Sequence, residues 1–250
     1  MPSAYDDYRY DEFWRGRDYE KEADFMAVKK LFSAMPSQKG LLLDIGAGNG
    51  RMVSLYENDW KKFILLDSSK EQLIAARERV TEGKNVRFLI ASSWDMPLPN
   101  GSCDAALCVR MFHYIDNPRK TIAEISRVVK PGGYLILEIP NKVHFKNRLR
   151  ALMALLYAPS LFWNLLSRES VDHSSYDDIP FVNHHPRTIA SLLEWNDFII
   201  ETTLSVSNFR SPLMKKAIPL SLLLLMENHF QRPLAKFFFG PSVYFLARKL

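Results

Sequence analysis

The stretch "LLLDIGAGNGR" at residues 41–51 determines the fold expected for this 250-residue chain. Its first half is a short apolar run, which is typical of a strand buried on both faces of a sheet. Its second half carries glycine at every second position and leads into a region with helical character. Because glycine tolerates positive φ and has no side chain, such a turn lets a ligand lie against the main chain. The alternative at this point is a tight turn that binds nothing.

A regular alternation of strands and helices extends on both sides of this turn. Apolar runs predict strands at residues 40–46, 62–67, 86–92, 103–110, 134–140, 197–207 and 242–249. Periodic apolar positions and capping residues predict helices at residues 19–35, 50–60, 68–80, 117–130, 186–196 and 217–230. This order predicts an α/β fold with a doubly wound, mostly parallel seven-stranded sheet and helices on both faces.

The spacing of the glycines excludes two common phosphate-binding loops. A Walker loop ends in Gly-Lys-Ser/Thr, whereas residues 48–51 read "GNGR". A dinucleotide-binding loop has the spacing G-x-G-x-x-G, which counted from Gly46 needs a glycine where Arg51 stands. The loop therefore suits a ligand without a pyrophosphate.

Two acidic residues narrow the choice of ligand. Asp44, at the carboxyl end of the first strand, would repel a phosphate and attract a cation. Asp67 ends the second strand, where open α/β sheets place a carboxylate on ribose hydroxyls. A ligand with a ribose, a positive charge and no phosphate satisfies both residues. S-adenosyl-L-methionine, with its ammonium and sulfonium groups, is such a ligand.

At these residues the chain resembles the class I S-adenosylmethionine-dependent methyltransferases, in their small-molecule branch. The resemblance extends over residues 40–140. It includes "SWDMPLPNGSCDAALCVRMFHYIDNPRKTIAEISRVVKPGGYLILEIPN" at residues 93–141, which is similar to the family's motifs in order and spacing. The resemblance implies an enzyme with a Rossmann-like fold that moves a methyl group from this cofactor to a small-molecule or lipid-like acceptor.

The resemblance also implies which residues hold the cofactor. Those that match its binding motifs are Asp44, Gly46, Ala47, Gly48, Gly50, Asp67, Ser68, Ser92, Ser93, Trp94 and Arg110. Many relatives bind the adenine amino group with an aspartate where this chain has Ser92, so a hydroxyl or main-chain group must act instead. Arg17 lies in a segment similar to one that folds over the cofactor, and it is expected to meet the methionine carboxylate. Tyr8 or Trp14 would cover the site, unless this segment is a plain helix start at the surface.

Methyl transfer is an in-line displacement from a good, neutral leaving group, so its rate comes mainly from positioning and from excluding water. His113, beside the end of the fourth strand, is the candidate catalytic base if the acceptor must lose a proton, although it could instead be structural. His113, Tyr176 and His184 are candidates for binding the acceptor. His184 and His185 lack a suitably spaced third ligand, so we expect no metal.

The chain divides into four expected parts. These are an N-terminal helical cap segment (1–38), a cofactor-binding α/β core (39–140), an inserted helical lid (141–186) and a C-terminal completion of the sheet (187–250). The insertion joins the basic stretch "KVHFKNRLR" at residues 142–150 to an uncharged apolar run at residues 151–167. It could be a lid over an apolar acceptor, a peripheral contact at a membrane interface, or a helix pair of an enlarged core.

Composition and charge limit the partners. The net charge is +5, and residues 141–250 hold the excess, with 13 basic and 8 acidic side chains. That bias could favour an anionic membrane or be an ordinary solvated surface. Two cysteines give no disulfide framework, and the polar N-terminus lacks the features of a signal peptide, so we expect a cytoplasmic protein.

Two rival functions stay open. Base-methylating relatives carry Asn/Asp-Pro-Pro-Tyr/Phe after the fourth strand, whereas residues 108–116 read "CVRMFHYID", so no nucleic-acid partner is expected. One rival is a methyltransferase of proteins or nucleic acids. The other is a protein that binds the cofactor without turnover.

Overall fold

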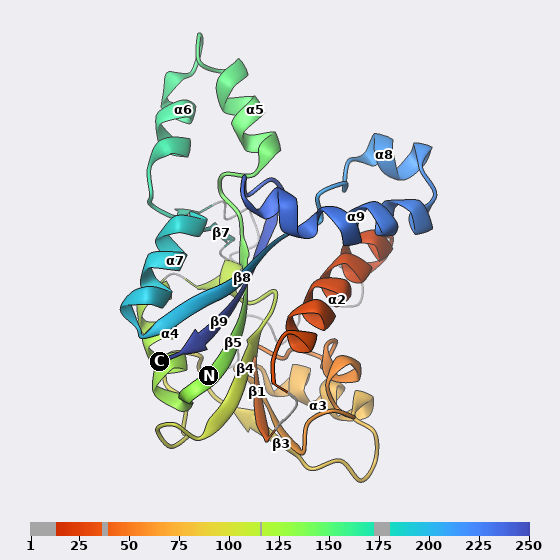
Figure 1. Ribbon diagram of the computed structural model, residues 1–250, viewed down its shortest axis with the longest axis vertical. Coiled ribbons are helices and arrows are strands. Elements are labelled where there is room, and N and C mark those ends of the chain that lie inside the picture. Colours follow the sequence, from red (N-terminus) through yellow and green to blue (C-terminus); the bar gives the residue numbers. More distant parts are fainter. Residues whose placement is uncertain (1–13, 37–39, 116, 173–180) are drawn as a thin grey trace.

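The computed structural model describes residues 14–36, 40–115, 117–172 and 181–250. A seven-stranded sheet of order β3-β2-β1-β4-β5-β9-β8 runs through the molecule (Figure 1). Its strands are β1 (Leu41–Ile45), β2 (Lys62–Asp67), β3 (Val86–Ile90), β4 (Cys103–Cys108), β5 (Val129–Pro140), β8 (Phe198–Val206) and β9 (Ser242–Lys249). The predicted doubly wound, mostly parallel sheet is confirmed. β9 is the exception, since it runs antiparallel to both of its neighbours, β5 and β8.

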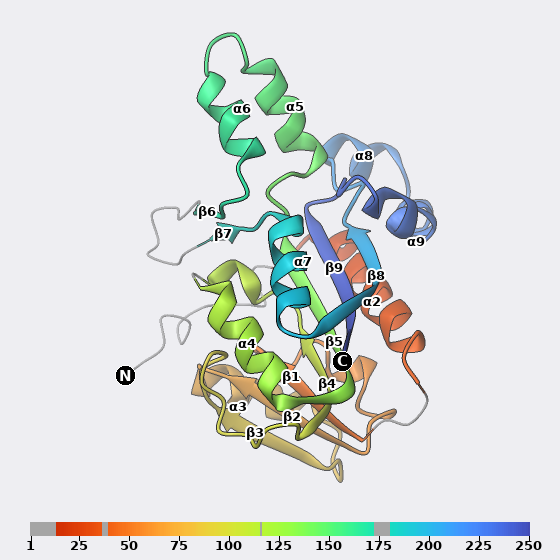
Figure 2. The same ribbon diagram turned by 60° about the vertical axis from the view of Figure 1, so that its left-hand side comes forward.

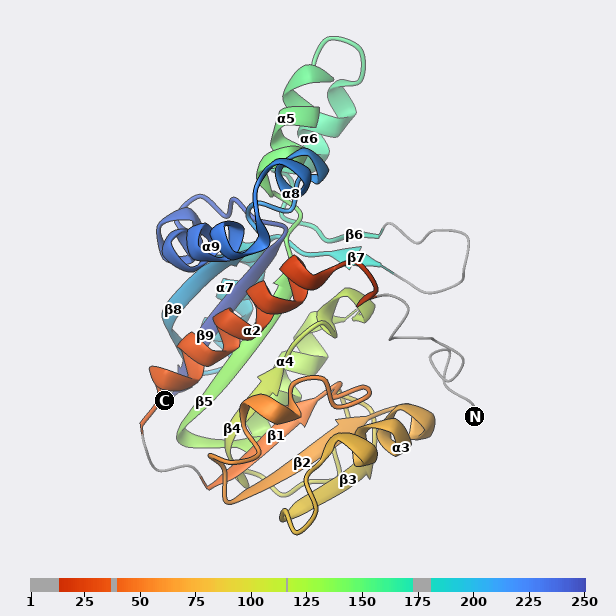
Figure 3. The same cartoon turned by 90° about the vertical axis from the view of Figure 1, so that its right-hand side faces the viewer.

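Helices cover both faces of the sheet, so its central strands are buried on two sides (Figure 3). One face carries α2 (Asp18–Ser33), α3 (Lys70–Arg79) and α9 (Leu220–Ala235). The other face carries α4 (Pro118–Val128) and α7 (Pro186–Trp195). The apolar runs that identified β1 and β2 in the sequence are therefore core residues on either face, as expected for parallel strands between two helical layers.

The helices α3 and α4 begin at residues whose side chains cap them. Ser69 precedes α3 and accepts a hydrogen bond from the backbone N–H of Gln72 at 3.2 Å. Asn117 precedes α4 and accepts one from the N–H of Lys120 at 3.3 Å, with Pro118 at the first helical position. Both contacts satisfy a donor that the helix itself leaves free. They fix the helix starts next to the carboxyl ends of β2 and β4.

The α-helix predicted at residues 50–60 is wrong. This segment contains one short 3-10 turn, η1 (Val53–Leu55), followed by irregular turns. Its apolar residues have helical spacing, but Tyr56 leaves the helical region at φ −135°. The Tyr56 ring packs edge-on against Phe32 and Phe63, and its hydroxyl donates to Asp44 at 2.7 Å. These tertiary contacts outweigh the local preference for helix.

The segment between β5 and α7 forms a helical hairpin. It consists of α5 (Phe145–Met153) and α6 (Pro159–Leu166), and it projects away from the sheet (Figures 1 and 2). Every residue of α6 is at least partly exposed, so the hairpin is not a core helix pair. The short strands β6 (Val171–Asp172) and β7 (Val182–Asn183) pair beside it, and α8 (Pro212–Ala217) precedes α9. Among the helices of the described residues, none combines the length and apolar content needed to cross a bilayer.

Candidate functional site

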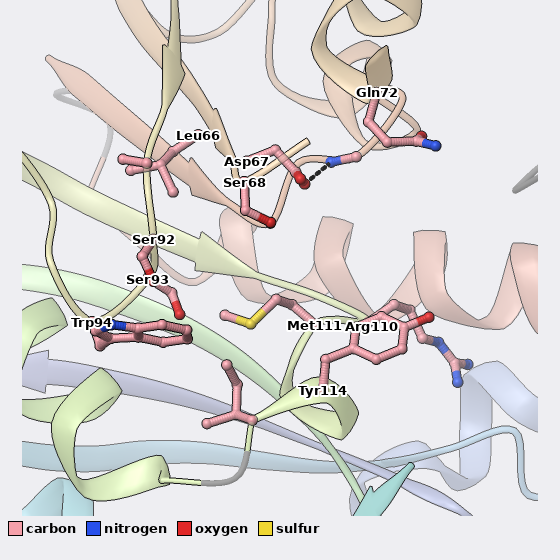
Figure 4. Close-up of a pocket in the computed structure, with 14 residues that line it drawn as sticks. Leu66, Asp67, Ser68, Gln72, Ser92, Ser93, Trp94, Arg110, Met111 and Tyr114 are labelled. Carbon is pink, nitrogen blue, oxygen red and sulfur yellow. Dashed lines mark hydrogen bonds between the residues drawn. The ribbon is translucent and has the colours of Figure 1, made fainter. Parts of the chain in front are cut away.

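A cavity opens at the carboxyl ends of β1, β2, β3 and β4, where the loops after these strands meet (Figure 4). Its wall is formed by Gly46, Gly48, Leu66, Asp67, Ser68, Gln72, Ala91, Ser92, Ser93, Trp94, Arg110, Met111, Tyr114 and Ile115. The carboxyl edge of an open parallel sheet is where such folds bind ligands. Eight of the residues predicted from the sequence to hold the cofactor belong to this wall.

The glycine loop adopts the conformation that its sequence predicts. Gly46 and Gly48 have φ of +67° and +53°. The N–H groups of Gly46 and Ala47 donate to the carbonyl of Leu66 at 2.8 and 3.0 Å, which ties the loop to β2. The main chain of the loop thus forms a bare ledge at one side of the cavity.

The two glycines differ in what a side chain would meet, and this difference can be tested. A Cβ at Gly46 would lie 2.4 Å from Met111 Cγ, whereas a Cβ at Gly48 would meet no described atom within 4 Å. We expect Gly46→Ala to destabilise the fold by about 2 kcal/mol or more, from strain and overpacking. Gly48→Ala should lose only about 1 kcal/mol of stability from its positive φ, but it should weaken binding in the cavity. Urea unfolding and calorimetry with S-adenosylhomocysteine measure the two effects, and equal destabilisation by both variants would contradict this account.

Asp67 joins the glycine loop to the start of α3. Its Oδ2 accepts a hydrogen bond from the N–H of Gly48 at 2.8 Å, marked by the dashed line in Figure 4. Its Oδ1 accepts one from the N–H of Ser69 at 2.9 Å. An ionised carboxylate offers about four lone-pair positions, so it can accept further hydrogen bonds while it makes these two. Asp67 is therefore oriented in advance and keeps capacity for a ligand's hydroxyl groups.

The opposite side of the cavity is aromatic and apolar. Figure 4 shows Trp94, Met111 and Tyr114 across the cavity from Asp67 and Ser68. This arrangement places flat, weakly polar surface opposite the groups that can bind hydroxyls. It suits a ligand that has a planar ring attached to a sugar.

Ser92 presents an unsatisfied hydroxyl in this wall. Its Oγ is buried and has no hydrogen-bond partner among the described residues. A buried hydroxyl without a hydrogen-bond partner destabilises the folded state unless a ligand or water supplies that partner. The predicted contact of Ser92 with the adenine of a cofactor stays a prediction.

Asp44 lies behind the cavity wall. It is 3% exposed and accepts the hydrogen bond from Tyr56 described above. Burial raises the pKa of Asp44 to about 7, although the hydrogen bond from Tyr56 opposes the rise. At neutral pH the carboxyl of Asp44 is therefore only partly ionised. Its contact with a positively charged ligand stays a prediction.

The raised pKa of Asp44 should make stability depend on pH. The pKa of this carboxyl is about 4 in the unfolded chain and about 7 in the native protein. Between these values the unfolded chain binds fewer protons, so the contribution of Asp44 to stability falls as pH rises through this window. Asp44→Asn should therefore gain stability relative to the parent from about pH 4 to about pH 7 and no further above it. Urea unfolding across the range measures this, and a constant difference between the two proteins would refute it.

Arg110 belongs to a buried cluster of charges that the sequence did not reveal. Its guanidinium donates from Nε and Nη2 to the two carboxylate oxygens of Asp24, each at 3.0 Å. Asp24 also accepts hydrogen bonds from Arg51 at 3.2 Å and from the Tyr244 hydroxyl at 2.7 Å. Burial alone would raise the pKa of Asp24, but the two guanidiniums and the hydroxyl outweigh it and hold the pKa below its usual range.

The backbone of Arg110 is also held by a hydrogen bond to Glu138. It has a positive φ of 58°, and its N–H donates to Glu138 Oε2 at 2.9 Å. A non-glycine residue in this conformation persists only where its surroundings over-determine it. Asp24 and Glu138 supply that constraint at the end of the cavity.

His113 lies next to the cavity but not in its wall. It is 9% exposed, and its ring stacks near Tyr114 and Phe181 with centroids 3.8 and 5.0 Å away. Burial, assisted by the charge of Arg110, lowers the pKa of His113 to about 3. The ring is therefore neutral at physiological pH and a weak base in this state. Its predicted roles in catalysis and acceptor binding stay predictions.

His184 is fixed by hydrogen bonds at both ring nitrogens. Nε2 lies 2.8 Å from the carbonyl of Phe112, and Nδ1 lies 2.8 Å from the hydroxyl of Ser170. This fully buried ring links β7 to the loop after β4 and has no place in the cavity wall. Its predicted contact with the acceptor stays a prediction.

Four more predicted residues lie outside the wall, and two more lie outside the described residues. Ala47 and Gly50 belong to the glycine loop, where Gly50 has φ +76° and packs against Ala76 of α3. Arg17 is exposed at the start of α2. Tyr176 lies outside the described residues, as does Tyr8. Trp14 lies over the buried arginines, with its ring 4.1 Å from the Arg51 guanidinium carbon.

Comparison with known proteins agrees with this geometry. Residues 43–137 match the family described as a methyltransferase domain. A malonyl-[acyl-carrier protein] O-methyltransferase from Marinomonas sp. (strain MWYL1) is 30% identical over 125 residues, which are 48% of this chain and 46% of the relative. The methyltransferase AacuQ of Aspergillus aculeatus is 27% identical over 125 residues, 50% of this chain and 40% of that protein. The chain thus spans less than half the length of these two relatives.

A solved structure shows that the likeness in fold extends further along the chain. A S-adenosylmethionine-dependent methyltransferase from Archaeoglobus fulgidus superposes with a TM-score of 0.63 at 15% identity. The superposition covers 96% of this chain and 100% of that one. Residues 43–137 of the chain thus match a methyltransferase domain, and the whole chain shares the fold of this solved methyltransferase.

Proposed function

We propose that this protein transfers a methyl group from S-adenosyl-L-methionine to a small-molecule or lipid-like acceptor. The observation that carries the proposal is the cavity at the carboxyl edge of the sheet. It combines a bare glycine ledge, a pre-oriented carboxylate at Asp67 and a buried, unpartnered hydroxyl at Ser92. These three features fit the methionine part, the ribose and the adenine of one ligand.

In this proposal, each part of the cofactor would contact particular residues of the wall. Asp67 would accept hydrogen bonds from the ribose hydroxyls, and Ser92 would bond the adenine ring while Trp94 covers it. The loop at Gly46 and Gly48 would carry the methionine part, with the backbone of Arg110 nearby. When bound, the cofactor supplies an electrophilic methyl group and a neutral leaving group.

The chain's own contribution to the reaction is mainly positioning. The residues of the wall hold the reacting centre at the carboxyl edge of the sheet, where an acceptor can approach in line, and the apolar side of the cavity excludes water. A His113 with a pKa of about 3 would remove a proton slowly at neutral pH. The site therefore suits an acceptor atom that is already nucleophilic at neutral pH, such as a carboxylate oxygen.

One relative supports a carboxylate acceptor by its name. The Marinomonas protein is a malonyl-[acyl-carrier protein] O-methyltransferase, which acts on an acidic group at the end of an acyl chain. At 30% identity over less than half of each protein, this likeness guides the choice of compounds to test.

Calorimetry and turnover test the proposal together. S-adenosylhomocysteine should bind the full chain, and tritium from methyl-labelled cofactor should enter acyl carboxylates more readily than amines or nucleic acids. Binding without transfer to any acceptor in a metabolite extract would favour a cofactor-binding protein without turnover. Transfer to protein or nucleic acid would assign that acceptor class instead. Tight binding of a nicotinamide dinucleotide or a nucleoside triphosphate, with none of S-adenosylhomocysteine, would overturn the proposal.

A further inference from the structure

The α5–α6 hairpin exposes apolar side chains to an unusual degree. Phe145, Leu149, Leu152 and Met153 recur on α5 at helical spacing, and each is 45–66% exposed. They form the apolar stripe of an amphipathic helix, but the stripe faces solvent instead of the core. The small residues Ala151 and Ala154 are buried in its place.

The turn between the two helices is more exposed still. Leu156 is 96% exposed and Tyr157 is 77% exposed, and on α6 Trp163 is 67% exposed. We call residues 152–157 the hairpin tip. In all three ribbon views the tip is the point farthest from the sheet (Figures 1, 2 and 3). Exposing a projecting apolar tip of this kind to water is unfavourable, and burying it in another apolar phase would remove that cost.

The charges around the tip all have one sign. Lys146, Arg148 and Arg150 are exposed on α5, and the sequence contains no acidic residue between Glu138 and Glu169. The exposed aromatic residues Tyr157 and Trp163 belong to the same hairpin as these cations. Exposed apolar and aromatic side chains combined with basic ones are typical of segments that lie in the interface of an anionic membrane.

A second apolar surface lies at the same end of the molecule. Leu213 on α8 is 79% exposed, and Lys216 follows it on the same helix. In Figures 1, 2 and 3 α8 lies at the same end of the molecule as the hairpin, and Figure 1 shows it set apart from α5. The hairpin leaves β5 at its carboxyl end, the edge of the sheet where the cavity lies. A flat surface that meets the hairpin tip would therefore face that edge.

We propose that the α5–α6 hairpin inserts its tip into the interface of an anionic lipid bilayer. The uniform positive charge favours a lipid surface over a second copy of this chain, because two such hairpins would repel each other. Neither helix is long enough to span a bilayer, so the contact is peripheral. The proposal concerns where the protein sits, and it is independent of the proposed reaction.

Sedimentation with vesicles tests the proposal. The full chain should pellet with vesicles that contain phosphatidylglycerol and much less with phosphatidylcholine alone, and added salt should weaken the binding. The double variant Leu156→Glu, Tyr157→Ser should reduce vesicle binding about tenfold or more. It removes apolar area that the bilayer would bury, and it adds a negative charge. Replacing Lys146, Arg148 and Arg150 with glutamine should remove the preference for anionic vesicles.

Matched controls keep the outcome readable. Ile74→Glu replaces a 55% exposed apolar residue on α3, far from the hairpin, and should bind like the parent. Asp67→Ala should also bind vesicles normally, which separates this proposal from the reaction. Quenching by brominated acyl chains should be strong in the parent and weak in Trp163→Phe. Equal binding by the parent and the tip variant would overturn the proposal. So would association of two chains through the tip in solution without binding to vesicles.

Discussion

Asp67→Ala is expected to raise the dissociation constant for S-adenosylhomocysteine about a hundredfold, as charge-assisted hydrogen bonds of this kind contribute about 1.5–3 kcal/mol. The ribose would lose its acceptor. In addition, the N–H groups of Gly48 and Ser69 would lose the carboxylate that holds them at 2.8 and 2.9 Å. The loss is therefore larger than that of one ligand contact, because the glycine loop loses its connection to α3 as well. Isothermal calorimetry on the folded variant measures it.

A neighbouring carboxylate provides the control for this experiment. Asp95 is exposed and lies outside the cavity wall, so Asp95→Ala should leave the dissociation constant nearly unchanged. Asp67→Asn keeps the shape of the side chain but removes the charge and one acceptor. Its dissociation constant should lie between those of Asp95→Ala and Asp67→Ala. If Asp67→Ala binds within threefold of the parent, the proposed site of the ribose is wrong.

Asp24→Ala is expected to have the largest effect on stability, about 3–5 kcal/mol. The substitution leaves the guanidiniums of Arg51 and Arg110 and the hydroxyl of Tyr244 without their shared acceptor. Two positive charges would then face each other with little solvent to screen them. Urea unfolding followed by circular dichroism gives the difference in free energy.

The sign of the pH dependence of Asp24 is opposite to that of Asp44. Because its native pKa is depressed, Asp24 contributes its full stability above the unfolded pKa of about 4 and loses it as pH falls through the native value. Asp24→Asn should not show this loss of stability as the pH falls. Glu201→Ala, which breaks the exposed ion pair with Arg248, is the control and should cost less than about 1 kcal/mol. Similar losses in Asp24→Ala and Glu201→Ala would show that the buried cluster does not stabilise the fold.

Much of the sheet and of the cavity could be predicted because the signals are local. The run at residues 242–249 and the strand β9 coincide, and β2 occupies the predicted residues 62–67. A strand buried on both faces is a continuous apolar run, which needs no knowledge of its neighbours. Asp67 ends β2 and Ser92 lies two residues after β3, so the parallel topology alone brings them to one edge.

What could not be predicted depends on contacts between distant segments. Asp24 meets Arg110 and Tyr244 across separations of 86 and 220 residues. The local signal was a charged residue within the apolar stripe of α2, since Asp24 is as buried as Ala23 and Ala27. Such a residue requires a buried partner, although the sequence does not say which one. The wrong helix at residues 50–60 has the same origin, in the distant partners of Tyr56.

The antiparallel strand β9 bears on how the protein is synthesised. β9 separates β5 from β8 in the sheet, yet it follows both of them along the chain. While the ribosome is still adding residues before Ser242, β5 and β8 present open edges that another nascent chain could join. Completion of the sheet therefore waits until residues 242–249 have emerged from the ribosome. Chaperone demand and losses to aggregation should accordingly be concentrated in the period before residues 242–249 emerge.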